Sequence, residues 1–469
     1  MERPTVQALA VGLSLPFDGP AARRAAERLL AAPDREASLA RLYPLLLRHK
    51  TWRHALQHLR AAGADLEQLG FPARTFLDTF PVRGRELWRV ADEIGGDRLT
   101  LAFLDELLSR HRGFVRDAVR ELAGQVPPAS FALVSGRAIE VCLPDYERRM
   151  EFDSDLLVPD VESGLQLLER LAAEGYVLRF FKLRDALRLA DSSMERYRDG
   201  HSVTVGVEMG GYQLFEGPIW ERARRVPWLG HEVLLPTVED LVLMIAARTR
   251  FMRTFQQVAV NDVALLLGEH HAAIDWDYLR SQAGSHGLLV NLKLLVEHAE
   301  RFVQGPLLPA DLDWGSGPAH RFLLRWGRDL VAGMALGSER PPPSRGARRR
   351  FGIAVRQTAA RDVASRLRSG SRVLQGLAYD WQRRFLGRAP GFAVRSLGAL
   401  RPRVGSLCEL RTSPLDAEAR GCVREALGRA PSGLLAAETR TALRRVADAL
   451  PGPGRRPHAC SGFTYDLES

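Results

Sequence analysis

Apolar residues recur at three- and four-residue spacings through much of residues 1–125. The stretch ASLARLYPLLLRHKTWRHALQHLR (37–60) shows this spacing, and so do residues 99–123. Such spacing gathers apolar side chains on one side of a helix. The Val126-Pro127-Pro128 triplet ends the second stretch, because proline lacks a backbone donor and clashes with the preceding turn. The pattern predicts a helical N-terminal region over residues 1–125.

From residue 131 the helical spacing gives way to short apolar runs and alternation. FALVSG (131–136) predicts a buried strand and a turn, MEFDSDLLV (150–158) a second strand, and residues 176–183 a third. Residues 161–175 predict a helix, while residues 137–143 fit a helix or a strand equally. HSVTVGVEM (201–209) alternates, with three valines on one face and Thr204, Gly206 and Glu208 on the other. We therefore expect a small mixed α/β unit at residues 126–215.

Helical spacing returns over residues 216–337, which we expect to pack on this unit. Thr237 is a candidate N-cap there, with Asp240 three residues on and the apolar run LVLMI following. Residues 338–350 have the proline- and arginine-rich composition of a linker, and residues 351–469 predict a mainly helical extension. The predicted fold class is α+β: a helix-rich chain around a small unit with a mixed sheet.

The composition limits the class of protein further. A length of 469 residues favours two or three domains. No apolar run reaches the roughly 18 residues of a membrane span, and the N-terminus lacks the features of a signal peptide. The four cysteines form no C-x-x-C pair, so a zinc site is not expected. Few, scattered cysteines suit a reducing compartment, so we expect a cytoplasmic protein.

Positive charge is concentrated near the C-terminus. The formal net charge is +10, yet residues 340–469 alone hold 25 arginines, no lysine and 10 acids. The whole chain has three lysines, an arginine excess that is typical of a GC-rich genome. A solvated arginine-rich surface is the simpler interpretation of this region. A face that binds nucleic acid or another polyanion is the alternative.

The candidate chemistry lies in VSGRAIEVCLPDYERRMEFDSDLLV (134–158). Asp153 and Asp155 are two residues apart on a predicted strand, so their side chains share a face. Mg²⁺ prefers such hard anionic oxygens, and two Mg²⁺ ions can stabilise both sides of a phosphoryl displacement. Glu208, on the alternating strand downstream, is the candidate for a third carboxylate. A D-x-D pair alone is weak evidence, because such pairs also occur on ordinary surface strands.

Ser135 and Gly136 follow a strand directly and precede the next element. Small residues there let backbone N–H groups approach a triphosphate, and a helix N-terminus would favour the anion. Arg149 lies four residues before Asp153, and its planar guanidinium can hold a phosphate. The alternatives are an ordinary tight turn and one more surface arginine.

This segment resembles a family of uncharacterised bacterial nucleotidyltransferases within the DNA polymerase β superfamily. Members carry Y-P-D-P-G-L-R-P-M-G-D-I-D-L-L-V, and this chain has L-P-D-Y-E-R-R-M-E-F-D-S-D-L-L-V, with Pro144, Asp145, Arg149, Asp153 and Asp155 in register. IWERARRV (219–226) looks like the family's tryptophan-arginine-alanine helix. LPTVEDLVLMI (235–245) and Asn261-Asp262 look like later elements. The resemblance covers roughly residues 95–300.

The chain departs from the family pattern at three places. Ser135 stands where the family has lysine, Gly206 where it has aspartate, and Glu208 where it has histidine. The histidines of a following helix are replaced by AARTR (246–250). Glu208 lies on the same strand face as Gly206, so it can take over the third-carboxylate role. The same departures are also compatible with a site that has lost its catalytic activity.

The resemblance implies a Mg²⁺-dependent transfer of a nucleoside monophosphate, AMP from ATP or another nucleoside triphosphate, to an unknown acceptor. Asp153, Asp155 and Glu208 would be the catalytic metal ligands, and Ser135, Gly136 and Arg149 would hold the triphosphate. The acceptor would be a small molecule, a peptide or a protein, in a bacterial biosynthetic pathway. An inactive nucleotide sensor or scaffold, and an arginine-rich nucleic-acid-binding protein, are the alternatives.

Overall fold

The chain was analysed as a computed structural model, which describes residues 6–73, 75, 98–143, 146, 153–184, 189–198, 201–212, 218–249, 255–303, 305–312, 314–315, 317–335, 347–348, 350–351, 354–355 and 408–411. The chain forms two compact units, each assembled from separate segments. Unit 1 comprises Met1–Gly113, Ile139–Phe152 and Ile245–Thr358. Unit 2 comprises Phe114–Ala138, Asp153–Met244 and Ala359–Ser469.

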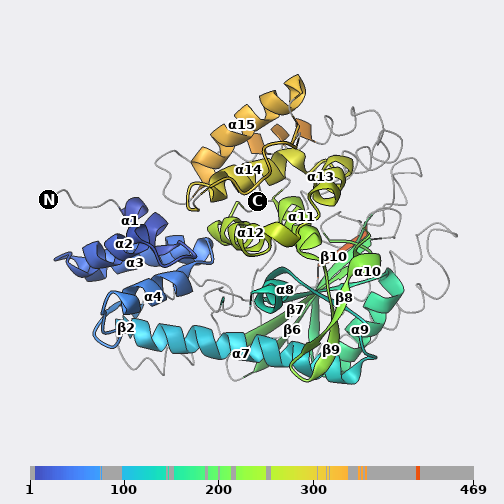
Figure 1. Cartoon of the computed structure of the whole chain (residues 1–469). Helices are drawn as coiled ribbons and strands as arrows, with labels where there is room; N and C mark the ends of the chain where they lie inside the picture. The colour runs from blue at the N-terminus through green and yellow to red at the C-terminus, as the bar shows by residue number, and fades with distance from the viewer. Residues whose placement is uncertain are drawn as a thin grey trace. The chain divides into compact units, whose positions relative to one another are not determined.

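Unit 1 is built mainly of helices (Figure 1). Its first segment holds α1 (Val6–Leu13), α2 (Pro20–Leu30), α3 (Arg35–Arg48), α4 (Trp52–Ala61) and the strands β1 (Gly70–Pro72) and β2 (Arg98–Thr100). The long helix α7 (Leu101–Gln125) begins here and ends in unit 2. Its third segment holds α12 (Gln257–Glu269), the 3₁₀ helix η2 (His271–Ala273), α13 (Trp276–Ser285), α14 (Leu289–Ala299) and α15 (Pro318–Met334). The helical region predicted before residue 125 is therefore present, with a short antiparallel β1–β2 pair that the spacing did not reveal.

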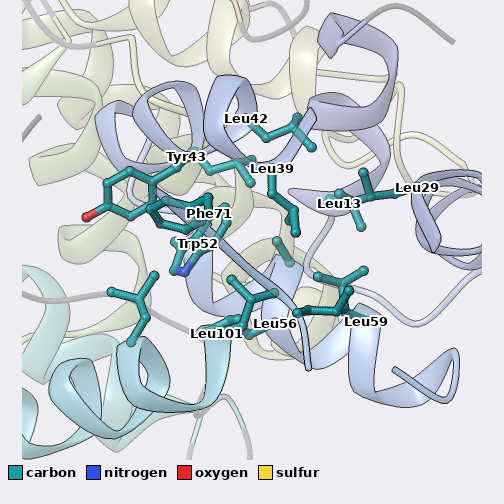
Figure 2. Close-up of a cluster of buried hydrophobic side chains, with 14 of the residues drawn as sticks. Leu13, Leu29, Leu39, Leu42, Tyr43, Trp52, Leu56, Leu59, Phe71 and Leu101 are labelled. Carbon is teal, nitrogen blue, oxygen red and sulfur yellow. The ribbon is translucent and has the colours of Figure 1, made fainter. Parts of the chain in front are cut away.

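An aromatic and leucine-rich core holds the N-terminal helices together (Figure 2). Tyr43, Trp52 and Phe71 are fully buried and pack against one another, with Tyr43 and Trp52 edge-to-face at 5.1 Å between ring centroids. Leucines from α1 to α4 and from the start of α7 surround them. Burying a large apolar side chain contributes about 1.5–3 kcal/mol, so this cluster is a main source of stability in unit 1.

Buried polar side chains join the first helices of unit 1 to α12. The hydroxyls of Ser14 and Thr51 are 2.8 Å apart, and Asn261 donates from its side-chain amide to the Ser14 carbonyl oxygen at 2.9 Å. Gln257 donates its backbone N–H to Nδ1 of His49 at 3.2 Å and its side-chain amide to Oδ1 of Asn261 at 3.0 Å. Buried polar groups need such partners, because an unsatisfied one costs about 1–3 kcal/mol.

Unit 2 is organised around a mixed sheet (Figure 1). Its strands are β3 (Ala132–Val134), β4 (Asp153–Val158), β5 (Val177–Arg184), β6 (Leu189–Arg198), β7 (His201–Met209), β8 (Arg224–Trp228), β9 (His231–Leu235) and β10 (Cys408–Arg411). In the described part of the chain, these eight strands lie in the order β10-β5-β6-β7-β4-β3-β9-β8. The pairs β4–β7 and β3–β9 are parallel, and the other pairs are antiparallel. The chain therefore combines a helix-rich unit with a mixed sheet, as the α+β prediction states.

Helices α9 (Val161–Ala173) and α10 (Ile219–Arg222) belong to unit 2, whereas α8 (Ser135–Cys142) and α11 (Val238–Arg248) begin in unit 2 and end in unit 1. Helix α9 contacts β4 to β7 along one face. A Cβ at Gly164 would overlap the Met209 side chain, so glycine allows α9 to approach that face closely. Met209, Val207, Val205 and Val203 are fully buried there. The opposite face of β4 and β7 carries Asp153, Asp155 and Glu208, as the alternation predicts.

Several predicted elements are confirmed. The strands at 131–136, 150–158, 176–183 and 201–209 and the helix at 161–175 are β3, β4, β5, β7 and α9, and residues 137–143 lie in helix α8 apart from Leu143. The Thr237 cap is also confirmed: the Asp240 N–H donates to Thr237 Oγ1 at 3.3 Å, and that hydroxyl donates to Asp240 Oδ2 at 2.9 Å.

The helical prediction for residues 216–337 is wrong over its first part. Residues 219–222 form the short helix α10, and residues 224–226 already belong to β8, which pairs with β9 in an antiparallel hairpin. β8 is an edge strand and contains Pro227, a residue that edge positions tolerate because no ladder hydrogen bond is needed from it. The predicted linker at 338–350 lies almost wholly outside the described residues, as does most of 351–469. Within the described residues, no helix has the length and apolar character needed to span a bilayer.

Candidate active site

The turn between β3 and α8 brings Ser135 next to the D-x-D strand. β3 and β4 are antiparallel, with Val134 opposite Asp155, so the chain leaves β3 beside Ser154 and Asp155. Ser135 has a φ of +55°, in the left-handed region that non-glycine residues rarely adopt. Such a conformation costs about 1–3 kcal/mol and is found where surrounding structure or function requires it. Here it turns the chain abruptly from the strand into α8.

Ser135 and Gly136 are the first residues of α8. The first N–H groups of a helix have no partner within the helix, and the helix dipole favours an anion at that end. Because this end of α8 lies beside β4, the two predicted phosphate-binding residues and the two predicted metal ligands come together at one edge of unit 2.

Asp153 and Asp155 are partly exposed, whereas Ser154, Leu156, Leu157 and Val158 on the same strand are buried. Their i, i+2 spacing on β4 places both carboxylates on the face that lies opposite the α9-covered face. Two partly exposed acids on one strand face can offer oxygen ligands to a divalent cation without being withdrawn from solvent.

Gly206 provides space for one of these carboxylates. It pairs with Asp155 across the parallel strands β4 and β7. A Cβ atom at Gly206 would lie 2.5 Å from Oδ1 of Asp155. The Asp155 carboxylate therefore lies over the glycine, and any side chain at residue 206 would have to displace it. Glycine at this position, where the family resemblance expects aspartate, leaves the space that this carboxylate fills.

Glu208 lies further along the same face. Its register partner on β4 is Leu157, two residues beyond Asp155, and its side chain is buried. From strand geometry its Cα is about 8 Å from that of Asp155 and about 14 Å from that of Asp153. Among the residues that the structure describes, no three or more histidine, cysteine, aspartate or glutamate side chains are gathered at metal-binding distance. The assignment of Glu208 as a metal ligand stays a prediction.

Arg149, the predicted phosphate clamp, lies outside the described residues, as do Pro144 and Asp145. Tyr146 of the same motif is described, and in unit 1 its hydroxyl is 2.7 Å from Nε2 of buried His54 on α4. This hydrogen bond fixes one point of the segment that leads from α8 to β4.

Arg137 is a site residue that the sequence did not indicate. It follows Gly136 in α8, is 1% exposed, and donates from Nε to the Ser154 hydroxyl at 3.0 Å. Ser154 lies between the two aspartates, so this bond ties the first turn of α8 to the D-x-D strand. The sequence signal that could have identified Arg137 is its position directly after the Ser-Gly turn. Nothing in the sequence shows that its side chain is buried.

The residues present fit a divalent cation in part. Asp153 and Asp155 supply hard oxygen ligands on one face, and the bare Gly206 leaves room for the Asp155 carboxylate. The left-handed turn at Ser135 brings a helix N-terminus to the same place, where it would meet an anion bound to that cation.

No curated protein matches the sequence of this chain. A family model, described as an uncharacterised nucleotidyltransferase, matches residues 135–304. The matched segment starts at Ser135 in the strained turn and includes Asp153, Asp155, Gly206 and Glu208. A nucleotidyltransferase domain is therefore present in this chain, and its first matched residue is the serine that opens α8 beside the paired aspartates.

Proposed function

We propose that this protein is a Mg²⁺-dependent nucleotidyltransferase with a polymerase β-type catalytic unit, which transfers AMP from ATP, or another nucleoside monophosphate, to an acceptor. One observation carries the proposal. The Ser135-Gly136 helix N-terminus and the Asp153 and Asp155 carboxylates meet at the β3–β4 edge, inside the matched segment.

In the proposed reaction, an acceptor oxygen forms a bond to the α-phosphorus of the nucleoside triphosphate. The bond from that phosphorus to its bridging oxygen breaks, pyrophosphate leaves with the electron pair, and the acceptor proton passes to a basic group or to water. Mg²⁺ held by Asp153 and Asp155 would supply charge neutralisation at the phosphate oxygens.

The protein's own groups have separate roles in this proposal. The N–H groups at the start of α8 bind the triphosphate, since they lack helical partners. Arg137 keeps α8 in place against β4 through its bond to Ser154. Arg149 is proposed as a second phosphate contact, because its fork-shaped guanidinium suits a phosphate group. By resemblance, the acceptor is a small molecule, peptide or protein of a bacterial biosynthetic pathway.

ATP binding, measured by calorimetry with and without Mg²⁺, tests the proposal without knowledge of the acceptor. The native chain is compared with an Asp153→Asn, Asp155→Asn double variant. Glu232→Gln, which removes an exposed acid from β9 of the same sheet, is the matched control. We expect Mg²⁺-dependent binding in the native chain and the control, and its loss in the double variant.

The other outcomes of the same experiment are also informative. No binding of any nucleoside triphosphate by the native chain would refute the enzyme proposal. Binding without release of pyrophosphate, tested across amine and hydroxyl acceptors, would favour the nucleotide-sensing scaffold, for which Gly206 in place of an aspartate is the supporting departure.

A further inference from the structure

The strand register aligns three polar side chains in one row across β4, β7 and β6. Asp153 pairs with Thr204 on β7, and Thr204 pairs with Glu195 on β6. Residues directly opposite one another in a sheet project from the same face. Glu195 therefore shares the face of Asp153 and Asp155, although none of the family motifs named above lies on its strand.

This row lies at the end of the sheet where the phosphate-binding turn is located. The chain leaves β3 beside Ser154, next to Asp153 at the start of β4. Glu208 lies in a different row, between Leu157 on β4 and Asp191 on β6. On this face of the sheet, that row is two rows beyond the row of Asp153, Thr204 and Glu195. Of the two glutamates on this face, Glu195 is thus the one in line with the Asp153 end of the site.

Thr204 and Gly206 of β7 lie between Glu195 and the two aspartates. Gly206 pairs with Asp155 on one side and with Ser193 on the other. Because Gly206 has no side chain, the Asp155 carboxylate can lie over it, toward β6. Two strand spacings put the Cα atoms of Asp153 and Glu195 about 10 Å apart. As they stand in the described structure, these carboxylates are not gathered at metal-binding distance. An aspartate and a glutamate that turn toward one another over that span can share a divalent ion with ligand distances of about 2.1 Å.

Thr204, in the middle of the row, carries an independent sign of a missing ligand. Its side chain is 5% exposed, and its hydroxyl has no hydrogen-bond partner within the part of the chain that the structure describes. A buried hydroxyl without a partner costs free energy, and ordered water, an ion's hydration shell or a substrate group commonly satisfies it. The hydroxyl is flanked by Asp153 and Glu195, where a hydrated metal ion would supply that partner.

We propose that Glu195, and not Glu208, supplies the third carboxylate of the nucleotidyltransferase site, with Thr204 binding a water of the same metal ion. This inference rests on the proposed function. The acid that the family carries on β7 is replaced by an acid from the neighbouring strand β6, which reaches the metal over Thr204 and Gly206.

Metal binding tests this inference without an activity assay. Mn²⁺ is titrated into the full-length protein in the presence of a non-hydrolysable ATP analogue, and free Mn²⁺ is measured by electron paramagnetic resonance. We expect Glu195→Gln to weaken Mn²⁺ binding at least tenfold and Thr204→Val to weaken it about three- to fivefold. The matched control is Asp191→Asn, on the same strand and face but two rows away, which should change binding less than twofold.

Two further variants keep the result decisive. Glu195→Asp retains the charge but retracts the carboxylate, so it should also weaken Mn²⁺ binding even if Glu195→Gln fails to fold. Glu208→Gln distinguishes the two glutamates: a tenfold loss there, with native-like binding in Glu195→Gln, would overturn the inference in favour of Glu208. Unchanged binding in both Glu195 variants would also overturn it.

Failure of this inference is separable from failure of the proposed function. If the native protein binds no Mn²⁺ with the nucleotide analogue, the proposed function itself fails. If native binding is lost in the Asp153→Asn, Asp155→Asn double variant but kept in the Glu195 variants, only the assignment of the third carboxylate fails.

Discussion

Lowering the pH from neutrality is expected to destabilise unit 1 through two buried histidines, His49 and His298. Burial, together with the charge of a neighbouring arginine (Arg48 for His49, Arg301 for His298), lowers the pKa of each from 6.5 to about 4. The hydrogen bonding agrees with a neutral His49, because its Nδ1 accepts the Gln257 N–H and cannot do so once protonated. His298 packs edge-to-face against Phe255 and Phe302.

The size of this loss of stability follows from the difference in proton binding between the folded and the unfolded chain. In the unfolded chain these histidines bind protons below about pH 6.5, whereas in the folded chain they stay neutral until the pH approaches 4. Their contribution to stability is therefore complete above pH 6.5 and is lost as the pH falls through the interval down to about 4. At about pH 5 the loss is about 2 kcal/mol for each histidine, or about 4 kcal/mol for both. That is a large fraction of a typical free energy of unfolding of about 5–15 kcal/mol.

The assay is urea unfolding, followed by circular dichroism, at about pH 7.5 and about pH 5. His49→Gln and His298→Gln remove one titrating group each, and glutamine at residue 49 can still accept the Gln257 N–H through its side-chain oxygen. Each variant should lose roughly half of the pH dependence, with about 2 kcal/mol less destabilisation at pH 5. His271→Gln, at an exposed position, is the control and should retain the full dependence.

Equal stability of the native protein at the two pH values would refute this reasoning. So would a full pH dependence in both buried-histidine variants, because the protons would then be taken up elsewhere.

Three other predictions concern the site and the core. Gly206→Ala should displace the Asp155 carboxylate and weaken Mg²⁺-ATP binding at least tenfold in calorimetry while changing the urea midpoint little; native-like affinity would contradict the close approach. Ser154→Ala removes the acceptor of the Arg137 Nε–H, so the free energy of unfolding should fall by about 1–3 kcal/mol in urea titrations; no change would mean that the bond contributes nothing. Trp52→Ala opens a cavity in the N-terminal core and should cost about 3–5 kcal/mol in the same assay, and a loss below 1 kcal/mol would show that the core can collapse around it.

The sequence predicted the central strands of unit 2 because their patterns reflect their surroundings. In β7 the valines at residues 203, 205 and 207 pack under α9, and the alternate positions share a face with the aspartates of β4. The left-handed turn at Ser135 was indicated by its small residues alone. These local signals were sufficient to bring together Ser135, Gly136, Asp153 and Asp155.

β6 could not be recognised in the same way. Its sequence, LADSSMERYR, has polar residues on both faces, so it lacks the alternation of a half-buried strand. Ser192 and Ser193 are buried because β6 lies between β5 and β7, with ladder hydrogen bonds on both sides. Tertiary position, rather than propensity, makes it a strand. Glu195 was missed for this reason, since its alignment with Asp153 depends on pairings between strands distant in sequence.

The segmented construction of unit 1 has a consequence for the order in which the protein can be completed during synthesis. Ser14 and Asn261 are 247 residues apart in the chain, and His49 and Gln257 are 208 apart, yet each pair is joined by a hydrogen bond in one unit. Bacterial and eukaryotic ribosomes add about 5–20 residues each second, so roughly 10–50 s pass between the synthesis of Ser14 and that of Asn261. In that interval the leucine and aromatic cluster of α1 to α4 can form, but the polar groups that will meet α12 remain hydrated. A nascent chain stalled before α12 would thus expose to water the polar groups that the finished unit buries.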